Sequence, residues 1–220
     1  PRLEFFGLPI AFFPELTVPD HTVKRKSGFL FPNFQFGDGL GFGVGIPYYL
    51  VFSPSMDLTT ELRGYSQQGF YAESEFRHRL NSGQYSVKVA GTYQLNPTLM
   101  SGVVDQRVNG RAMLGTQGRF QINPRWAFGW NILVQTDKNF ANTYAINGFN
   151  DYYHRSEIYL TGLNKRNYFD LRFMRFQVQE SALNGRNEIQ PWVAPSLDYS
   201  YTLDRPLAGG ELNIGLIMQG

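Results

Sequence analysis

Apolar and polar residues alternate along most of the chain. In residues 56–64 the even positions are Met, Leu, Thr, Leu and Gly, whereas the odd positions of 57–65 are Asp, Thr, Glu, Arg and Tyr. A period of two is typical of a β-strand whose two faces meet different surroundings. The alternation recurs in residues 70–80, 85–95, 111–122 and 125–135 and, less regularly, in 156–163, 167–179, 189–203 and 210–218. The pattern predicts an all-β chain without helices, and a slip of phase near residues 172–176 suggests a β-bulge.

The predicted strands are roughly ten to thirteen residues long, which exceeds the usual length in soluble sheets. Their apolar faces end in Tyr, Trp and Phe, whereas Glu73, Glu75, Arg77 and Arg79 place charges at successive positions of one polar face. Alternating segments of about ten residues with aromatic ends suit a transmembrane β-barrel, apolar toward lipid and polar toward a wet lumen. A soluble sandwich has the same period with its faces exchanged, so the period alone does not decide.

The lengths of the predicted connections favour the barrel. When strands are counted from Gly28, every second connection is a tight turn, whereas the long connections 96–108, 136–155 and 180–187 all fall in the other set. Short turns at one end and long loops at the other are the rule for outer-membrane barrels. The tight turns are expected at 53–54, 81–82, 123–124, 164–166 and 204–208.

Composition removes several classes of function. The 20 basic and 18 acidic residues leave a net charge of +2, which excludes a polyanion-binding tail, and the absence of Cys excludes disulfide scaffolds and thiolate chemistry. His21, His78 and His154 have no Ser or carboxylate at motif spacing. We therefore expect a protein without enzymatic activity, without a cofactor and without a metal site. Gly and Pro break the longest uncharged stretch, residues 39–56, which excludes a spanning helix.

The first 27 residues differ from the rest. Pro9, Pro14 and Pro19 punctuate an apolar stretch and limit it to edge or end-of-sheet strands, and a polar, basic stretch follows at 21–27. We expect residues 1–20 to end a separate β domain, 21–27 to be a linker, and 28–220 to form about eleven strands. With no initiator Met, we expect the chain to belong to a longer protein.

Two prolines mark the hairpin of residues 28–50. If the hairpin turns about Asp38-Gly39, Pro32 faces Gly45 and Pro47 faces Leu30, so both missing amide donors fall at nearly the same height. They could weaken a seam, or they could blunt an edge strand against aggregation.

Glycine at positions 39, 41, 43 and 45 leaves one face of the second strand of this hairpin without side chains. This makes the hairpin pliable or gives room to a bulky neighbour. Phosphate binding by a G-x-G-x-G loop is excluded because no helix follows.

The run VKRKSGFLFPNF at 23–34, followed by GFGVGIPYYLVFSPSMDLTTELRGYSQQGFYAESEFRHRL at 41–80, resembles the lipopolysaccharide-assembly family of the Gram-negative outer membrane (LptD/OstA). The run GLPIAFFPELTVPD at 7–20 is similar to the end of that family's periplasmic β-jellyroll. After residue 80 only the strand rhythm and the proline-containing turns agree. The resemblance implies the end of the jellyroll followed by the N-terminal segment of a large antiparallel transmembrane β-barrel.

The resemblance also implies a function. The family inserts lipopolysaccharide into the outer leaflet through a lateral opening beside the first barrel strands. The implied partners are lipopolysaccharide, a lipoprotein plug inside the barrel (LptE type), a periplasmic bridge protein (LptA type) reached through the jellyroll, and outer-membrane lipid, with no nucleic acid. The implied location is the outer membrane, with the N-terminal part in the periplasm.

Three groups of residues are candidates for this function. The lateral gate would comprise Pro32, Pro47, Gly39, Gly41, Gly43 and Gly45. The lipid path would comprise Lys24, Arg25, Lys26, Phe29, Phe31, Phe34 and Tyr48, although the basic residues equally suit a solvated hinge. Asp57, Glu61, Arg63, Glu73, Glu75, Arg77 and Arg79 would face the lumen, either paired across strands or in contact with a plug or sugar chain.

The main alternative is a passive porin or receptor-type outer-membrane barrel, which needs neither the proline pair nor the basic lead-in. An outer-membrane enzyme lacks support because no Ser/His pair is found. A soluble lipid-binding sandwich conflicts with the charges on its supposed inner face.

Overall fold

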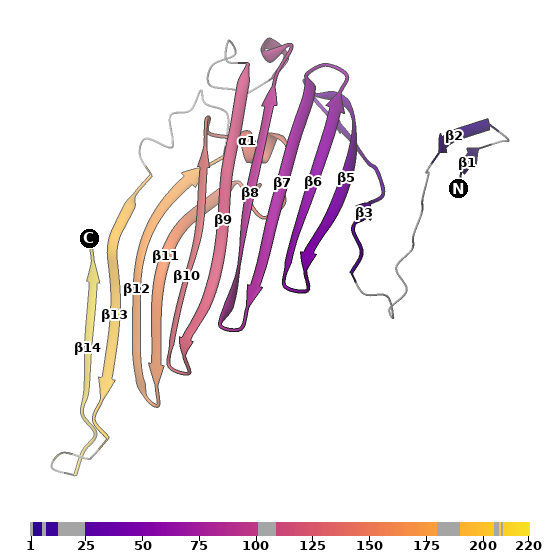
Figure 1. The fold of residues 1–220 in the computed structure, drawn as a ribbon. Helices are drawn as coiled ribbons and strands as arrows, with labels where there is room; N and C mark the ends of the chain where they lie inside the picture. Colours follow the sequence, from indigo (N-terminus) through magenta and orange to yellow (C-terminus); the bar gives the residue numbers. More distant parts are fainter. Residues whose placement is uncertain are drawn as a thin grey trace.

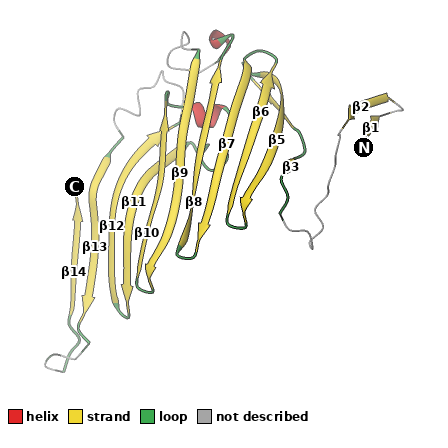
Figure 2. Ribbon diagram, in the orientation of Figure 1, coloured by secondary structure: helices red, strands yellow, loops and turns green. Residues whose placement is uncertain are grey.

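A computed structural model describes residues 2–5, 8–12, 25–100, 109–179, 190–204, 207 and 209–220. Most of the described chain forms one 12-stranded antiparallel sheet, a curved wall of long strands (Figures 1 and 2). The predicted all-β fold is confirmed.

Except at its start, the sheet is a meander in which each strand pairs with the next along the chain. Its strands are β3 (Gly28–Phe29), β4 (Asn33–Gly37), β5 (Gly41–Ser53), β6 (Met56–Tyr65), β7 (Gly69–Leu80), β8 (Gly83–Tyr93), β9 (Gly110–Asn123), β10 (Trp126–Gln135), β11 (Tyr153–Asn164), β12 (Asn167–Val178), β13 (Trp192–Thr202) and β14 (Asn213–Gln219). Both β3 and β4 pair with β5, so together they are two pieces of one first strand.

Four short elements of the described chain lie outside this sheet. β1 (Arg2–Phe5) and β2 (Leu8–Phe12) pair with each other in an antiparallel two-stranded sheet. Two loops contain single turns of helix, η1 (Pro97–Leu99) and α1 (Phe140–Thr143), which the strand pattern did not predict. Among the described residues, no helix is long and apolar enough to cross a membrane.

The connections separate by length as predicted. Tight turns at 54–55, 81–82, 124–125 and 165–166 lie at one end of the sheet, the turn end, and 94–109, 136–152 and 179–191 connect strands at the other, the long-loop end (Figure 1). The prediction was wrong for one turn. The connection expected at 204–208 is longer, because β13 ends at Thr202 and β14 begins at Asn213.

The two faces of the sheet have opposite character. One face, here called the apolar face, presents Phe34, Phe70, Val89 and Leu114 with 46–71% of their surface exposed. The other, the polar face, holds Asp57, Arg63, Lys88, Arg111 and Asp170, each at most 9% exposed. A water-soluble sheet buries its apolar side and exposes its charges, so this sheet has the reverse arrangement.

The buried apolar cluster lies on the polar face at the long-loop end, where residues 136–152 fold back over the strands (Figure 1). Its members are Leu40, Tyr65, Tyr71, Ala90, Met100, Met113, Leu133, Phe140, Ala141, Tyr144, Ile146 and Phe149. Burial raises the pKa of the Tyr144 hydroxyl, which accepts a hydrogen bond from Gln94 Nε2 at 3.0 Å. The sequence predicted this segment only as a long loop.

A register shift occurs near residues 172–176, where the sequence predicted a bulge, but the extra residue lies on the neighbouring strand. β12 pairs with β11 without a shift from Asn167 to Val178. Against β13, Arg172 faces Ser196 and Met174 faces Val193, so β13 uses three steps where β12 uses two. The apparent slip within β12 arises from its composition, since Arg175 and Gln177 lie on the same side as Phe173.

Candidate functional site

The first strand is interrupted beside β5. Phe29 faces Tyr48, and the next regular pair is Asn33 with Gly45, so one extra residue is accommodated in the first strand between them. The Leu30 amide donates to the Pro47 carbonyl at 2.9 Å, as expected for the predicted pairing of these two residues. The prediction that Pro32 faces Gly45 was wrong by one position because of the extra residue.

The two prolines explain why the ladder stops here. In an antiparallel pair the N–H and C=O of one residue point to the same neighbour. Because the Pro47 carbonyl accepts from Leu30, the Pro47 nitrogen also faces the first strand, where it has no hydrogen to donate. Pro32 likewise lacks a donor. The backbone therefore cannot complete the ladder between Phe29 and Asn33.

The glycines of β5 make room for neighbouring side chains on the polar face. A Cβ atom at Gly43 would overlap the Tyr65 ring, and one at Gly45 would overlap the Asn33 side-chain oxygen and the Glu61 carboxylate. Gly39 and Gly41, at the hairpin tip, have φ of 76° and 75°, a conformation that favours glycine. The sequence left two interpretations of these glycines, a pliable hairpin or room for a bulky neighbour. The structure shows the second, because neighbouring side chains occupy the space.

Five side chains use this space to join β4 to β6 across β5, and we call them the clasp: Asn33, Gln35, Glu61, Arg63 and Tyr65. Asn33 Nδ2 donates to Glu61 Oε2 at 3.0 Å, and Arg63 Nη1 donates to Gln35 Oε1 at 2.5 Å. The Tyr65 hydroxyl also donates to Gln35 Oε1, at 2.8 Å. Strands two positions apart are separated by about 10 Å, so these contacts require a middle strand without side chains.

Arg63 holds the clasp together. Its Nε donates to Glu61 Oε1 at 2.7 Å and its Nη1 to the Tyr65 hydroxyl at 2.9 Å. The side chains of Arg63 and Glu61 are 11% and 14% exposed. Removing one partner of a largely buried, hydrogen-bonded ion pair strongly destabilises the folded protein, because the other charge stays buried without a counter-ion.

The tip of the first hairpin is also fixed. Leu40 is buried in the apolar cluster with Met100. Gln68 Nε2 donates to the carbonyls of Gly39 at 2.5 Å and Asn96 at 2.8 Å, which ties the short connections 38–40 and 66–68 to the start of the 94–109 connection. The long-loop end of the hairpin is therefore anchored by packing as well as by the clasp.

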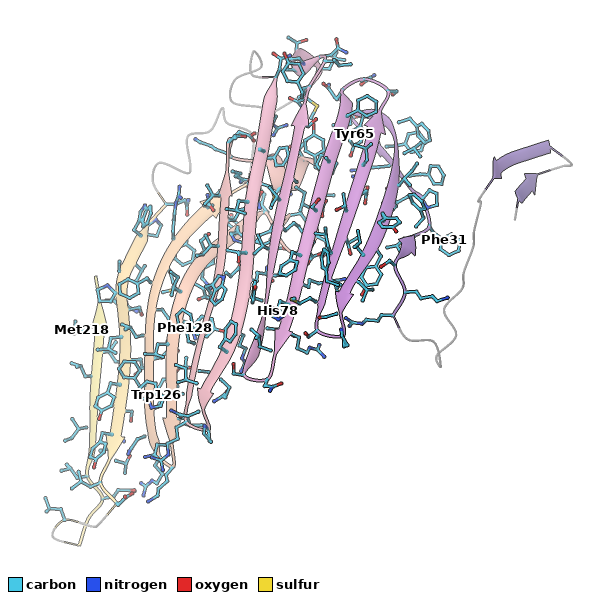
Figure 3. All side chains as sticks on the ribbon, in the orientation of Figure 1. Phe31, Tyr65, His78, Trp126, Phe128 and Met218 are labelled. Carbon is cyan, nitrogen blue, oxygen red and sulfur yellow. The ribbon has the colours of Figure 1, made fainter. Side chains whose placement is uncertain are left out.

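The turn end of the hairpin is exposed. Phe29 and Phe31 keep 68% and 69% of their surface accessible on the described chain. Figure 3 shows Phe31 beside β3 at the edge of the sheet, whereas Tyr65 lies near the long-loop end. Phe29 packs edge-on against Tyr48 with ring centroids 4.9 Å apart. Among the described residues, two ladder pairs with Tyr48 and Tyr49, the Leu30 amide and a bond from the Val51 amide to the Ser27 hydroxyl also join this part to β5.

The basic lead-in contacts the polar face. Arg25 Nη1 lies 3.0 Å from Asp57 Oδ2, and Arg77 Nε lies 2.7 Å from the other oxygen of the same carboxylate. Lys26 is exposed, and Lys24 lies outside the described residues. Arg25 and Arg77 are each about half exposed, so this pairing is weaker than the clasp.

The other predicted lumen residues lie on the polar face, where opposite charges pair across strands. Lys88 Nζ lies 3.3 Å from Glu73 Oε1 and 3.5 Å from Glu75 Oε2. In the part of the chain that the structure describes, Arg79 has no ion-pair partner. It lines a polar hollow of about 650 Å³ near the turn end, together with Arg25, Asp57, Glu75, Arg77, Arg119 and Glu157.

The site offers binding surfaces rather than a catalytic arrangement. His78 Nδ1 contacts the Tyr85 hydroxyl at 3.3 Å on the apolar face, on the opposite side of the sheet from the paired carboxylates. Among the described residues, no three His, Asp or Glu side chains are grouped as metal ligands.

Sequence reasoning missed Asn33, Gln35 and Tyr65. The first two face Gly45 and Gly43 of β5, and Tyr65 faces Gly43 from β6. A pattern that could have identified them is a glycine in the middle strand of three, with a polar residue directly opposite it on each neighbouring strand.

Comparisons with known proteins show which family this sequence resembles. Residues 109–220, just over half of the chain, match the family model of LptD, LPS transport system D. The LPS-assembly protein LptD of Shewanella sp. (strain MR-4) is 27% identical over 201 residues, covering 91% of this chain. That of Actinobacillus pleuropneumoniae serotype 5b (strain L20) is 25% identical over 220 residues, covering 97%.

The chain spans about a quarter of the length of these relatives, 25% and 27% respectively. The family model matches the half of the chain where the resemblance drawn from motifs rested on strand rhythm and proline-containing turns, and the relatives extend the match to the first hairpin. The all-β sheet and both sets of matches lead to one conclusion: the chain belongs to the LptD family of lipopolysaccharide transport proteins.

Proposed function

We propose that this chain forms the part of an outer-membrane translocon through which lipopolysaccharide passes sideways into the outer leaflet. The opening lies beside the first strand, at the turn-end half of the β3–β5 hairpin. The observation that supports this most directly is the interruption at Leu30–Pro32, where two prolines leave the ladder incomplete at the edge of the sheet. The activity is transport without a catalytic step.

The reversed faces of the sheet support a membrane location. Strands β5 to β12 are 10–14 residues long, and tilted strands of about this length cross a bilayer. Exposed aromatic and aliphatic side chains would face lipid, and the charged polar face would line the interior. We place this part of the chain in the outer membrane of a Gram-negative bacterium, with the tight turns on the periplasmic side.

The N-terminal residues fit a periplasmic position in this scheme. Residues 1–20 would end the jellyroll that delivers lipid, 21–27 would form the linker, and 28–220 would begin the barrel. Arg25 and Lys26 lie where this linker meets the turn end, and their charges suit the phosphate groups of a glycolipid. A plug lipoprotein and a periplasmic bridge protein would be the protein partners.

The exposed aromatic residues mark the proposed lipid path. Phe29 and Phe34 lie on the apolar face, and Phe31 lies in the interruption between β3 and β4. Tyr48 lies opposite Phe29. Acyl chains leaving through an opened seam would contact these side chains before they reach bulk lipid.

Photocrosslinking in cells tests the proposal. A photoreactive residue is placed at Phe29, Phe31, Phe34 or Tyr48 of the full-length protein, and lipopolysaccharide adducts are detected. Gln117, on the polar face of β9, serves as a control far from the first strand. We expect adducts at the hairpin that decrease when Pro32 and Pro47 are replaced by Ala. Adducts strongest at Gln117, or none at the hairpin, would contradict the lateral path and favour a pore that conducts along its axis.

A further inference from the structure

The contacts of the first hairpin are divided unequally between its two ends. β4 makes five regular pairs with β5, and β3 makes two. The clasp also joins β4 to β6, whereas no described side chain of β3 reaches past β5. From this geometry we infer that the clasp residues Asn33, Gln35, Glu61, Arg63 and Tyr65 are positioning residues that restrict opening to residues 25–32.

This inference rests on the proposed lateral opening and specifies where along the first strand it occurs. If β4 leaves β5, the Asn33–Glu61 and Gln35–Arg63 contacts must break together with the backbone ladder. Arg63 and Glu61 would then lose partners in a site that is largely buried. Arg63 and Glu61 stay paired with each other on β6, but each loses its charge-assisted hydrogen bond with β4, and such bonds are about twice as strong as neutral ones. Separation of β4 is therefore much less favourable than separation of β3.

The penalty is smaller at the turn end, where fewer side-chain contacts break and they are more exposed. When residues 25–32 leave β5, the side chains that lose contacts are chiefly Arg25, Ser27 and Phe29. Asp57 keeps Arg77 at 2.7 Å, so no buried carboxylate is left alone. Pro32 and Pro47 have no ladder bonds to break on their nitrogen side. The interruption therefore acts as the boundary between a movable piece and a fixed piece.

This division requires the two glycines of β5 at positions 43 and 45, here called the glycine row. The clasp contacts pass over Gly43 and Gly45, because a side chain at either position would occupy the same space. The glycines thus serve to fix the long-loop half of the hairpin, in contrast to the pliable hairpin that a glycine-rich strand suggests from sequence.

The test measures separation of the first strand from β6 with pairs of spin labels on the apolar face. Phe34 and Leu62 report on the clasped half, and Phe29 and Thr60 report on the turn-end half. In each pair, one residue lies on the first strand and the other on β6. Phe29 and Thr60 are directly opposed, about 10 Å apart across β5, and Leu62 is offset by two residues from the position opposite Phe34, which makes that separation about 12 Å. All four positions are exposed, so the labels should not disturb packing.

Dipolar broadening of the spectra is recorded for the full-length protein in lipid vesicles. We expect a single short separation for Phe34/Leu62 and an additional longer separation for Phe29/Thr60. In the Asn33→Ala, Gln35→Ala double variant, the first pair should gain the longer separation at a fraction severalfold above wild type. Gln84→Ala is the matched control, because it removes an amide from the polar face outside the clasp.

Two results would overturn the inference. One is equal separations for both pairs in the wild type, and the other is an unchanged Phe34/Leu62 pair in the double variant. These spectra require no lipopolysaccharide, so they are independent of the transport proposal. If the spectra show the asymmetry while photocrosslinking finds no lipopolysaccharide at the hairpin, the clasp stands and the lateral path fails.

Discussion

The two halves of the first hairpin differ in every contact that holds them to the sheet. At the long-loop end, β4 is bound by five ladder pairs, by the clasp across β5, and by Leu40 and Gln68 at the tip. At the turn end, β3 has two ladder pairs, and the residues around it contribute exposed aromatic side chains and one partly exposed ion pair, that of Arg25. Under the proposed lateral opening, one edge strand would combine a fixed half and a releasable half, divided by a break of three residues.

The largest effect should come from removing the centre of the clasp. Arg63→Met deletes the bonds to Glu61, Gln35 and Tyr65 and leaves a largely buried carboxylate unpaired. We expect a loss of about 3–5 kcal/mol in the free energy of unfolding of the full-length protein, measured by urea denaturation in lipid vesicles. Arg79→Met, at a position without a described ion-pair partner, should change it by less than about 0.5 kcal/mol. Equal effects of the two substitutions would mean that the clasp contributes no more to the free energy of unfolding than an arginine without an ion-pair partner.

A side chain on the glycine row should have the next largest effect. Gly45→Val places atoms where Asn33 and Glu61 meet, so the clasp must open or β5 must shift. We expect a destabilisation of about 1–3 kcal/mol, measured in the same way. Gly64→Val is the control, because a Cβ there meets only Phe70, at an ordinary 3.8 Å. A destabilised control with an unaffected Gly45→Val would contradict the assignment of space in the clasp.

Restoring a ladder donor should make the turn end resemble the clasped end. Pro47→Ala supplies an N–H that faces Leu30, which adds about 1 kcal/mol of pairing between β5 and the first strand. We expect slower hydrogen exchange of the amides in residues 28–32 and a lower yield of lipopolysaccharide adducts at Phe31. Pro54→Ala, in the tight turn at 54–55, should change neither. Exchange that stays at the wild-type rate in Pro47→Ala would show that the proline does not limit pairing.

The smallest effect should come from the ion pair at the start of the first strand. Arg25→Gln removes one of two guanidinium groups on Asp57, and Arg77 remains in place. Because Arg25 is about half exposed, we expect a loss of about 0.5 kcal/mol or less, which disappears in high salt. Urea denaturation at low and high salt measures it. A loss as large as that of Arg63→Met would contradict the unequal division between the two halves.

The strands, their turns and the reversal of polar and apolar faces could be predicted because each depends on local alternation. Asp57 and Arg63, for example, lie on the polar face as their odd positions in residues 57–65 require. The proline pair could also be found, because a missing donor is a property of one residue. Its register was off by one position, since the extra residue beside Pro32 depends on how two strands pair.

The clasp and the folded-back segment could not be predicted in the same way. Asn33 and Glu61 are 28 residues apart and meet only because the strand between them has no side chain at Gly45. Residues 136–152 fold over the sheet because Phe140, Tyr144 and Phe149 find a matching apolar area on five different strands. Periodicity describes one strand at a time, so contacts that skip a strand or cross several of them are invisible to it.

A pair of disulfide locks tests the central claim most directly. Phe29→Cys with Tyr48→Cys links β3 to β5, and Phe36→Cys with Phe42→Cys links β4 to β5. Both pairs are directly opposed aromatic contacts, with ring centroids 4.9 and 4.8 Å apart, at positions where the ladder forms no bonds and Cα atoms lie about 4.5 Å apart. The 220 residues contain no Cys of their own.

Delivery of lipopolysaccharide to the cell surface is measured with each lock oxidised and then reduced. The account predicts that the Phe29/Tyr48 lock reduces delivery and that reduction of the disulfide restores it, whereas the Phe36/Phe42 lock has little effect. Equal inhibition by both locks, or inhibition by the Phe36/Phe42 lock alone, would contradict an opening confined to the turn end of the first strand.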